Sequence, residues 1–212
     1  NAEDLYSEIW NGFEFHRGKM AGKDVLIAKS GLGKVFAAMV CQKIINTYEP
    51  EKIIFTGLAG ALNKDLEIGD VVISHDCMYH DLETEALGYS RGAIPYTDYK
   101  IFLADEQLKN LALETMLPNN KVIAGRILTG DQFMTRAKIK EFAYLTEELK
   151  GDVVEMEGAA VGHVCTVNQI PFVIARTVSD KADGEAGLDF NKFLDKAAKN
   201  SWQVVKTILN KL

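Results

Sequence analysis

The stretch that decides the fold class is Phe172–Asp180, which reads FVIARTVSD. It is short and opens with four apolar residues, a pattern typical of a strand covered on both faces. Five more strand-like runs are rich in β-branched and aliphatic residues. They are Phe13–Arg17, Val25–Lys29, Ile53–Thr56, Val71–Ser74 and Val122–Leu128. Helical patterns alternate with these runs, and the alternation predicts an α/β layer fold with a largely central mixed sheet.

Four helices are predicted from apolar residues that recur at helical spacing. The first follows Gly33 and ends before Pro50, the second lies between a Thr135 cap and a Gly151 stop, and the last has Asp189 near its start. The residues expected on the buried faces are Val35, Ala38, Met39 and Ile45 in the first helix, Ile139, Phe142, Ala143 and Leu149 in the second, Met156, Ala159, Ala160, His163, Val164 and Val167 in the third, and Phe193, Ala197, Val205 and Ile208 in the fourth.

Length and composition indicate one domain that spans residues 1–212, without internal repeats or a linker. The net charge of −6 argues against a nucleic-acid partner, which would need a basic face, and favours a small-molecule ligand. No apolar run reaches membrane-spanning length. Cys41, Cys77 and Cys165 lie far apart and form no zinc or disulfide pattern, which suits a reducing, cytoplasmic compartment.

Two glycine-containing segments follow predicted strands. Ile54–Ala61 is interpreted as a strand that runs into a glycine-rich turn, where backbone amides either face a ligand or simply close a tight turn. Ser30–Lys34 lacks the spacing of a phosphate-binding loop and is interpreted as a strand-to-helix turn.

Acidic side chains occur where two strands end. In Val153–Ala160, which reads VVEMEGAA, Glu155 and Glu157 flank Met156 directly before a helix of small residues. A carboxylate there either accepts hydrogen bonds from a ribose diol or favours the helix N-terminus electrostatically. The second strand, Phe172–Asp180, carries Arg176 and Asp180 to its end, where α/β active sites form, although a cap or loop salt bridge is the alternative.

Five motifs in this order and spacing resemble those of bacterial 5'-methylthioadenosine/S-adenosylhomocysteine nucleosidases. They are Thr56-Gly57-x-Ala59-Gly60, Tyr79-His80-Asp81, Thr129-Gly130-Asp131-x-Phe133, Val154-Glu155-Met156-Glu157 and Ser179-Asp180-x-Ala182-Asp183. The resemblance runs from about Phe13 to the C-terminus. It implies the nucleoside phosphorylase-like fold, a three-layer sandwich around a mixed sheet, and a homodimer that acts on an adenine nucleoside. No cofactor and no metal are expected.

The resemblance also implies separate catalytic roles for the two acids Asp180 and Glu157. Asp180 would be the general acid that protonates adenine N7, with Ser179 orienting it. Glu157 would bind the ribose hydroxyls, with Met156 packed beside the sugar. Glycosidic cleavage places positive charge on the ribose and negative charge on the departing base, so an acid at N7 and an anion at the sugar both favour the transition state.

The same resemblance assigns the remaining site residues. Phe133 would stack on adenine while the backbone near Met134 reads its edge, and Arg176 and Glu155 would form a polar floor near the nucleophilic water. Phe190, in a Gly184–Phe190 flap, would close over the nucleoside. The residues expected to line the alkylthio pocket of the neighbouring subunit are Leu87, Tyr89 and Pro95.

Two departures from the family pattern stand out. Family members begin with a strand of the form I-G-I-I-G-A-M-x-x-E-E whose glutamate activates the water, and no such strand is predicted before Phe13, where Asn1–Leu5 looks like the segment that follows it. The water-activating glutamate is therefore not assigned, because Glu3, Glu8 and Glu14 do not follow a buried strand and a glycine turn. In addition, Leu58 occupies a position where many relatives carry serine.

Three alternatives to hydrolysis of methylthioadenosine and S-adenosylhomocysteine stay open. A phosphorylase must hold phosphate with several donors, but Leu58 offers no hydroxyl and the Gly31–Lys34 turn lacks a Gly-x-Pro-Ser character. The missing glutamate would also fit a non-catalytic nucleoside-binding homologue. The third alternative is hydrolysis of 6-amino-6-deoxyfutalosine, a menaquinone precursor that has the same adenine-ribose half.

Overall fold

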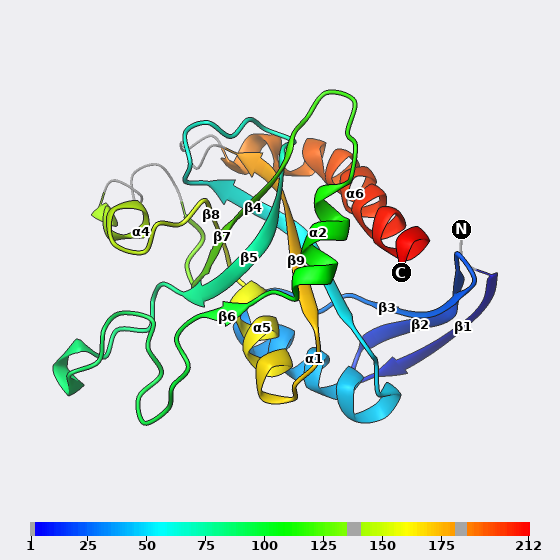
Figure 1. The fold of residues 1–212 in the computed structure, drawn as a ribbon, viewed down its shortest axis with the longest axis horizontal. Helices are drawn as coiled ribbons and strands as arrows, with labels where there is room; N and C mark the ends of the chain where they lie inside the picture. Colours follow the sequence, from blue (N-terminus) through cyan, green and yellow to red (C-terminus); the bar gives the residue numbers. More distant parts are fainter. Residues whose placement is uncertain (1–2, 135–140, 181–185) are drawn as a thin grey trace.

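The computed structural model describes residues 3–134, 141–180 and 186–212, with the side chains of residues 3–4 and 186–193 left aside. Figure 1 shows the order of the elements along the chain. They are β1 (Glu3–Trp10), β2 (Phe13–Met20), β3 (Lys23–Ala28), α1 (Lys34–Tyr48), β4 (Ile53–Ala61), β5 (Val71–Tyr79), η1 (Glu85–Leu87), β6 (Phe102–Leu103), α2 (Glu106–Leu113), β7 (Val122–Thr129), α4 (Tyr144–Glu147), β8 (Val153–Glu155), α5 (Gly158–Val167), β9 (Phe172–Asp180) and α6 (Ala186–Lys211).

The central sheet is mixed, as the sequence predicts. Its strands lie in the order β6-β5-β7-β8-β4-β9, and an antiparallel β5–β9 pairing joins its two sides. The pairs β4–β9, β5–β7 and β7–β8 are parallel, whereas β4–β8 and β5–β6 are antiparallel. Gly60 pairs with both Val154 and Asp180, so β4 lies between the strand that precedes Glu157 and the strand that Asp180 ends.

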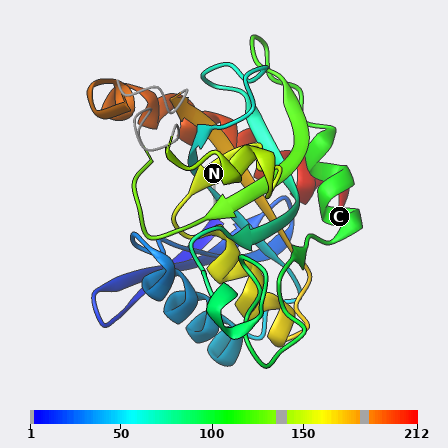
Figure 2. The ribbon, with the colours of Figure 1, turned by 90° about the vertical axis from the view of Figure 1, so that its left-hand side faces the viewer.

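Helices cover both faces of this sheet and make three layers. One core cluster joins α1 and α5 to the sheet, and Figure 2 shows these two helices side by side. A second cluster joins α2 and α6 to the opposite face. All nine residues of β9 are buried between the layers, which confirms the prediction of a strand covered on both faces. No helix in the described part of the chain is both long and apolar enough to span a membrane.

The strands predicted from the sequence do not include one that precedes Phe13. β1 occupies Glu3–Trp10 and pairs antiparallel with β2, and with β3 they form a separate three-stranded sheet. The turn between β1 and β2 is Asn11-Gly12, with φ of 48° and 83°. Positive φ at both central residues is the geometry of a two-residue hairpin turn, for which Asn-Gly is the strongest short sequence signal.

Three predicted buried faces need correction. In α1, Val35 is 78% exposed, and the buried residues are Ala37, Val40, Cys41 and Ile45. In α6, Val204 is fully buried where Val205 was predicted, while Ala197 and Ile208 are buried as expected. The third helix begins at Gly158 rather than Met156, and its last residue, Val167, is exposed. In α1 and α6 the buried face lies about one residue away from the predicted face, because several neighbouring apolar residues made more than one face plausible.

The second predicted helix is shorter in the part that the structure describes. α4 covers only Tyr144–Glu147, and Leu145 and Leu149 pack into a small core cluster with Met134. Thr135 and Ile139 lie outside the described residues, and so does the side chain of Phe193.

Candidate active site

A buried ion pair joins the middle of β9 to the end of β8. Arg176 on β9 is 1% exposed, and its Nη2 is paired with Oε2 of Glu155 on β8. The guanidinium also lies 4.4 Å from the ring centroid of Phe55 on β4. A buried cation with a carboxylate on one side and an aromatic face on the other is held in one position.

The carboxylate of Glu155 is almost completely engaged by protein donors. Besides Arg176, it accepts the hydroxyl of Thr129, the N–H of Glu157 at 3.1 Å, and the N–H of Gly158 at 2.9 and 2.7 Å from its two oxygens. These donors offset the cost of burying a charge. Two of these donors belong to the start of α5. Glu155 therefore holds both the guanidinium of Arg176 and the N-terminus of that helix in place.

The Gly57-containing segment is strand rather than turn, which corrects the sequence interpretation. β4 continues through Ala61, and Gly57 pairs with Arg176 on β9. A Cβ on Gly57 would lie 1.9 Å from Nη1 of Arg176, so the missing side chain leaves room for the guanidinium. In contrast, Ser30–Lys34 does connect β3 to α1, as predicted.

Glu157 lies beside this pair, just before α5. Its Oε1 accepts the N–H of Gly33 at 2.8 Å, and its Oε2 is 3.7 Å from Nη2 of Arg176. Burial, followed by the charge of Glu155, raises the pKa of Glu157, while the Gly33 N–H and Arg176 oppose the rise. Glu157 is therefore a partly buried carboxylate in a site that already holds a second one.

The other acid closes β9. Asp180 is 8% exposed, and its Oδ2 accepts the Ser179 hydroxyl at 2.8 Å. The register pairs Asp180 with Gly60, and Gly60 with Val154, the residue before Glu155. The two predicted acids, Glu157 and Asp180, therefore belong to the two strands that flank β4 and have different immediate partners.

Comparison with known proteins identifies the family. The family profile described as "Phosphorylase superfamily" matches residues 6–210. The 5'-methylthioadenosine/S-adenosylhomocysteine nucleosidases of Bacillus anthracis and Bacillus cereus are 40% identical over 213 aligned residues, with 99% of this chain and 91% of each relative covered. The chain belongs to this nucleosidase family within the phosphorylase superfamily.

Solved structures of the nucleosidase family match the fold closely. The Neisseria meningitidis nucleosidase in complex with methylthio-immucillin-A has a TM-score of 0.93 and 35% identity, over 100% of this chain and 91% of that one. The Colwellia psychrerythraea nucleosidase in complex with adenine has a TM-score of 0.93 and 36% identity, over 100% and 88%. The futalosine hydrolase of Helicobacter pylori has a TM-score of 0.90 and 33% identity, over 99% and 89%.

The residues that the nucleosidase resemblance assigns to adenine follow β7. Phe133 is 50% exposed, whereas Met134 is buried in the cluster with Leu145 and Leu149. Met156 lies between the two acids and is partly buried. The side chain of Phe190 lies outside the described residues, as do Gly184 and Glu185 of the predicted flap, whereas Ala186 already belongs to α6.

The predicted alkylthio-pocket residues lie in the segment between β5 and β6, which carries η1 and extends away from the sheet (Figure 1). Leu87 is 59% exposed, Pro95 is partly buried, and the hydroxyl of Tyr89 accepts the N–H of Tyr96 at 3.1 Å. An apolar side chain this exposed is available for a partner.

A charged cluster beside the site was missed by sequence reasoning. Nζ of Lys34 lies 2.9 Å from both carboxylate oxygens of Asp81 and 3.1 Å from Oδ2 of Asp131. The signal was present, because both aspartates stand in family motifs at strand ends and Lys34 opens a helix. Sequence spacing could not show that these three distant residues meet.

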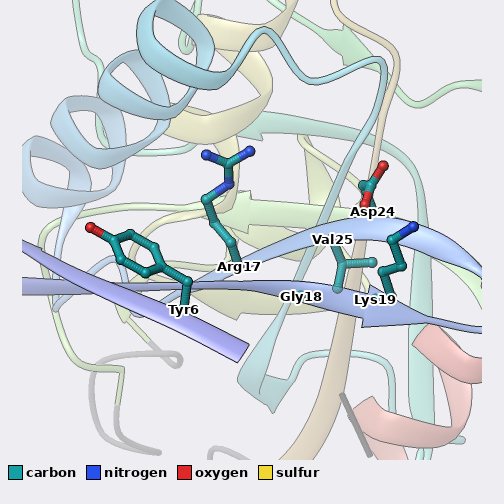
Figure 3. A pocket seen from close by; sticks show the side chains of 6 residues that line it. All are labelled: Tyr6, Arg17, Gly18, Lys19, Asp24 and Val25. Atoms are coloured by element: carbon teal, nitrogen blue, oxygen red, sulfur yellow. The ribbon is translucent and has the colours of Figure 1, made fainter. Parts of the chain in front are cut away.

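Two further observations concern metal-binding groups and pockets. In the described residues, no group of three or more His, Cys, Asp or Glu side chains is suited to hold a metal ion. A shallow pocket of about 250 Å³ lies on the β1–β2–β3 sheet (Figure 3) and contains none of the predicted site residues. It is lined by Tyr6, Arg17, Gly18, Lys19, Asp24 and Val25.

Proposed function

We propose that this protein hydrolyses the N-glycosidic bond of 5'-methylthioadenosine and S-adenosylhomocysteine and releases adenine and the 5'-thioribose product. The observation that carries the proposal is the placement of two acids on the strands that flank β4, with Glu157 just after β8 beside the Arg176–Glu155 pair and Asp180 at the end of β9 beside Ser179. Curated relatives at 40% identity are named for this activity.

Asp180 is the proposed general acid. Glycosidic cleavage leaves the electron pair of the C1'–N9 bond on the base, and a proton delivered to adenine N7 neutralises it. Well-placed acid catalysis of this kind contributes roughly 10²–10⁴-fold. The Ser179 hydroxyl donates to Oδ2 of Asp180. This hydrogen bond fixes the orientation of the carboxyl group.

Glu157 is the proposed clamp on the ribose, with Met156 packed beside the sugar. A carboxylate accepts both hydrogens of the 2',3'-diol. Its negative charge interacts more strongly with the cationic sugar of the transition state than with the neutral substrate, so it lowers the barrier rather than only improving binding.

Arg176 and Glu155 are the proposed polar floor near the attacking water. Glu155 already accepts from Arg176, Thr129 and two backbone N–H groups. A carboxylate with its oxygens so occupied is suited to fix its neighbours rather than to take a proton from water. We therefore assign to this pair the orientation of the water and no role as its base.

The remaining contacts are proposed from family resemblance and exposure. Phe133 stacks on adenine, the backbone at Met134 reads the base edge, and Phe190 closes over the nucleoside. Leu87, Tyr89 and Pro95 line the alkylthio pocket of the neighbouring subunit in a homodimer. Exposed apolar side chains support such an interface, among them Leu32, Val35 and Phe36 around the start of α1 and Leu87 and Tyr96 in the segment between β5 and β6.

Sedimentation velocity tests the homodimer. We expect twice the chain mass for the wild type and a shift toward monomer for Val35→Asp, because a charge buried in an apolar interface lacks a partner. A monomeric wild type contradicts the shared pocket.

We also propose a reducing, cytoplasmic location, which the three buried free thiols suit.

A product assay tests the reaction. Methylthioadenosine is incubated with the protein in the presence and absence of phosphate, and adenine and the sugar product are separated by chromatography. We expect equal adenine release in both conditions and methylthioribose as the sugar. A sugar 1-phosphate that forms only with phosphate would establish phosphorolysis instead. Tight binding of methylthio-immucillin-A without any adenine release would establish a non-catalytic binding protein.

A second substrate is favoured by one comparison. The similarity to the Helicobacter pylori futalosine hydrolase makes 6-amino-6-deoxyfutalosine a candidate, since its adenine-ribose half would meet the same side chains. The ratio of kcat/KM values for the two substrates decides. We expect a higher value for methylthioadenosine, and a reversed ratio assigns the protein to the futalosine reaction.

A further inference from the structure

We propose that Lys34 is a positioning residue that couples the ribose clamp to the adenine-binding segment, through Asp81 and Asp131. This inference rests on the proposed function, since it assigns a role within the same site.

The ammonium group of Lys34 holds three chain segments together. Lys34 is the first residue of α1, Asp81 follows β5, and Asp131 follows β7. Nζ lies 2.9 Å from both oxygens of Asp81 and 3.1 Å from Asp131, and the N–H of Asp131 donates to Asp81 at 2.7 Å. Burial lowers the pKa of Lys34, but the two carboxylates outweigh it and raise the pKa overall, so the group stays charged.

The first segment leads directly to the ribose clamp. Gly33 precedes Lys34, and its N–H donates to Oε1 of Glu157 at 2.8 Å. Gly33 has φ of 89°, a backbone conformation that glycine adopts without steric cost. The direction of this N–H depends on how the turn enters α1. The anchored side chain of Lys34 therefore sets the position of the donor that Glu157 accepts.

The third segment leads to the adenine side. Asp131 stands two residues before Phe133, the proposed stacking residue, and three before Met134. Both its side chain and its N–H are tied to the cluster, through Lys34 and Asp81. The same ammonium thus fixes the entry to the adenine-binding segment and the donor at the sugar.

The exposure of Asp131 separates a positioning role from a stabilising one. The side chain of Asp131 is 61% exposed, and exposed ion pairs contribute little to the free energy of unfolding. The Lys34 and Asp81 side chains are only 23% and 19% exposed, so loss of Lys34 also destabilises the fold. A small displacement of groups around a reacting centre changes rates strongly. Loss of the Asp131 charge is therefore expected to affect turnover much more than folding, and the effect of Lys34 on turnover is measured in the folded fraction.

The test is Lys34→Met in the full chain, with Lys109→Met as the matched control. Lys109 also pairs with a carboxylate, Glu106 at 2.6 Å, but on the surface of α2. We expect kcat/KM for methylthioadenosine to fall on the order of 10²-fold in Lys34→Met and to stay within about twofold of wild type in the control. The thermal midpoint should fall more in Lys34→Met than in the control, because Asp81 is mostly buried whereas Glu106 is exposed, so kcat/KM is compared in the folded fraction.

A double-mutant cycle provides the readout that a merely structural role would not move. If Lys34 acts through Glu157, adding Lys34→Met to Glu157→Gln should reduce kcat/KM much less than it does in the wild type. Effects that simply multiply would overturn the proposed coupling. The same cycle is measured with the Kd of methylthio-immucillin-A, which does not require turnover, so a wild type that released no adenine would refute the proposed function and still test this inference.

Asp131→Asn tests the adenine arm and covers the case in which Lys34→Met does not fold. The change keeps the size of an exposed side chain and removes the charge that faces Lys34. We expect weaker binding of free adenine, measured by calorimetry, and no further weakening when Lys34→Arg is added. Wild-type adenine affinity in Asp131→Asn would show that the cluster does not position the adenine segment.

Discussion

Replacing Gly57 with alanine perturbs the site through a single methyl group. The added Cβ would stand 1.9 Å from Nη1 and 3.0 Å from Cζ of Arg176. Because contacts between such atoms become favourable only at about 3.5 Å, the guanidinium must retreat by roughly 1.5 Å. Arg176 is fully buried between Phe55 and Glu155, so it cannot swing into solvent to make room.

The cost follows from what the retreat breaks. Overpacking a core by one methyl group costs about 1–3 kcal/mol, and leaving a buried ion pair without one partner costs about 3–5 kcal/mol. The guanidinium is planar and moves as a unit, so its pairing with Glu155 is strained rather than lost. We expect the free energy of unfolding to fall by about 3 kcal/mol, where these two ranges meet. A displacement of this size at the polar floor should lower kcat on the order of 10²-fold.

Gly125→Ala is the matched control, since Gly125 is also a strand glycine without room for a Cβ. Its Cβ would stand 2.7 Å from Cγ1 of Val72 and 2.9 Å from Oδ2 of Asp152, and the three atoms nearest to it include none of Arg176. Chemical denaturation gives the stability change, and adenine release gives kcat. We expect both variants to be destabilised and only Gly57→Ala to lose turnover in its folded fraction. Equal kcat losses in the two variants, or a wild-type kcat in Gly57→Ala, would refute the reasoning.

Three further predictions concern the two acids. Asp180→Asn should abolish adenine release while nucleoside binding, followed by calorimetry, stays largely intact, because an amide has no proton to transfer to N7; a near-normal rate would remove Asp180 from the role of acid. Glu157→Gln should lower kcat more than it raises KM, and an effect confined to KM would mean that Glu157 binds substrate and transition state equally. Burial and Glu155 raise the pKa of Glu157, and the ionised form binds the cationic sugar. As pH falls, kcat/KM should therefore begin to decline above the ordinary glutamate value of about 4.5, and this limb should be missing in Glu157→Gln; a limb that persists there belongs to another group.

The sheet was largely predictable because its longer strands open with runs of apolar residues. The apolar start of Phe172–Asp180 fits a buried strand, and no other secondary structure fits this segment as well. β1 was missed because its residues, EDLYSEIW, mix polar and apolar side chains, and its partner is defined by the Asn11-Gly12 turn rather than by hydrophobicity. β6 and β8 have two and three residues, too few to show any period.

The site was predictable only where its residues follow strands. Glu157 and Asp180 could be placed because chain position after a buried strand decides where they lie. Gly57 could not be interpreted correctly, since glycine has the same sequence signal in a turn and beside a bulky neighbour, and that neighbour, Arg176, is far away in the sequence. Lys34 was missed for the same reason, because its two partners come from the ends of different strands.

We infer that the charges around Arg176 favour a cationic sugar at the proposed site. One guanidinium serves two carboxylates, with Glu155 in direct contact and Glu157 at 3.7 Å. Glu155 is further compensated by Thr129 and by the N–H groups at the start of α5, whereas Glu157 has the Gly33 N–H. The pair of carboxylates thus keeps about one uncompensated negative charge. In the proposed reaction a neutral ribose leaves that charge unbalanced, and the positive charge that develops as the glycosidic bond breaks completes the balance. On this proposal, the spacing of two glutamates around one arginine favours the transition state over the substrate.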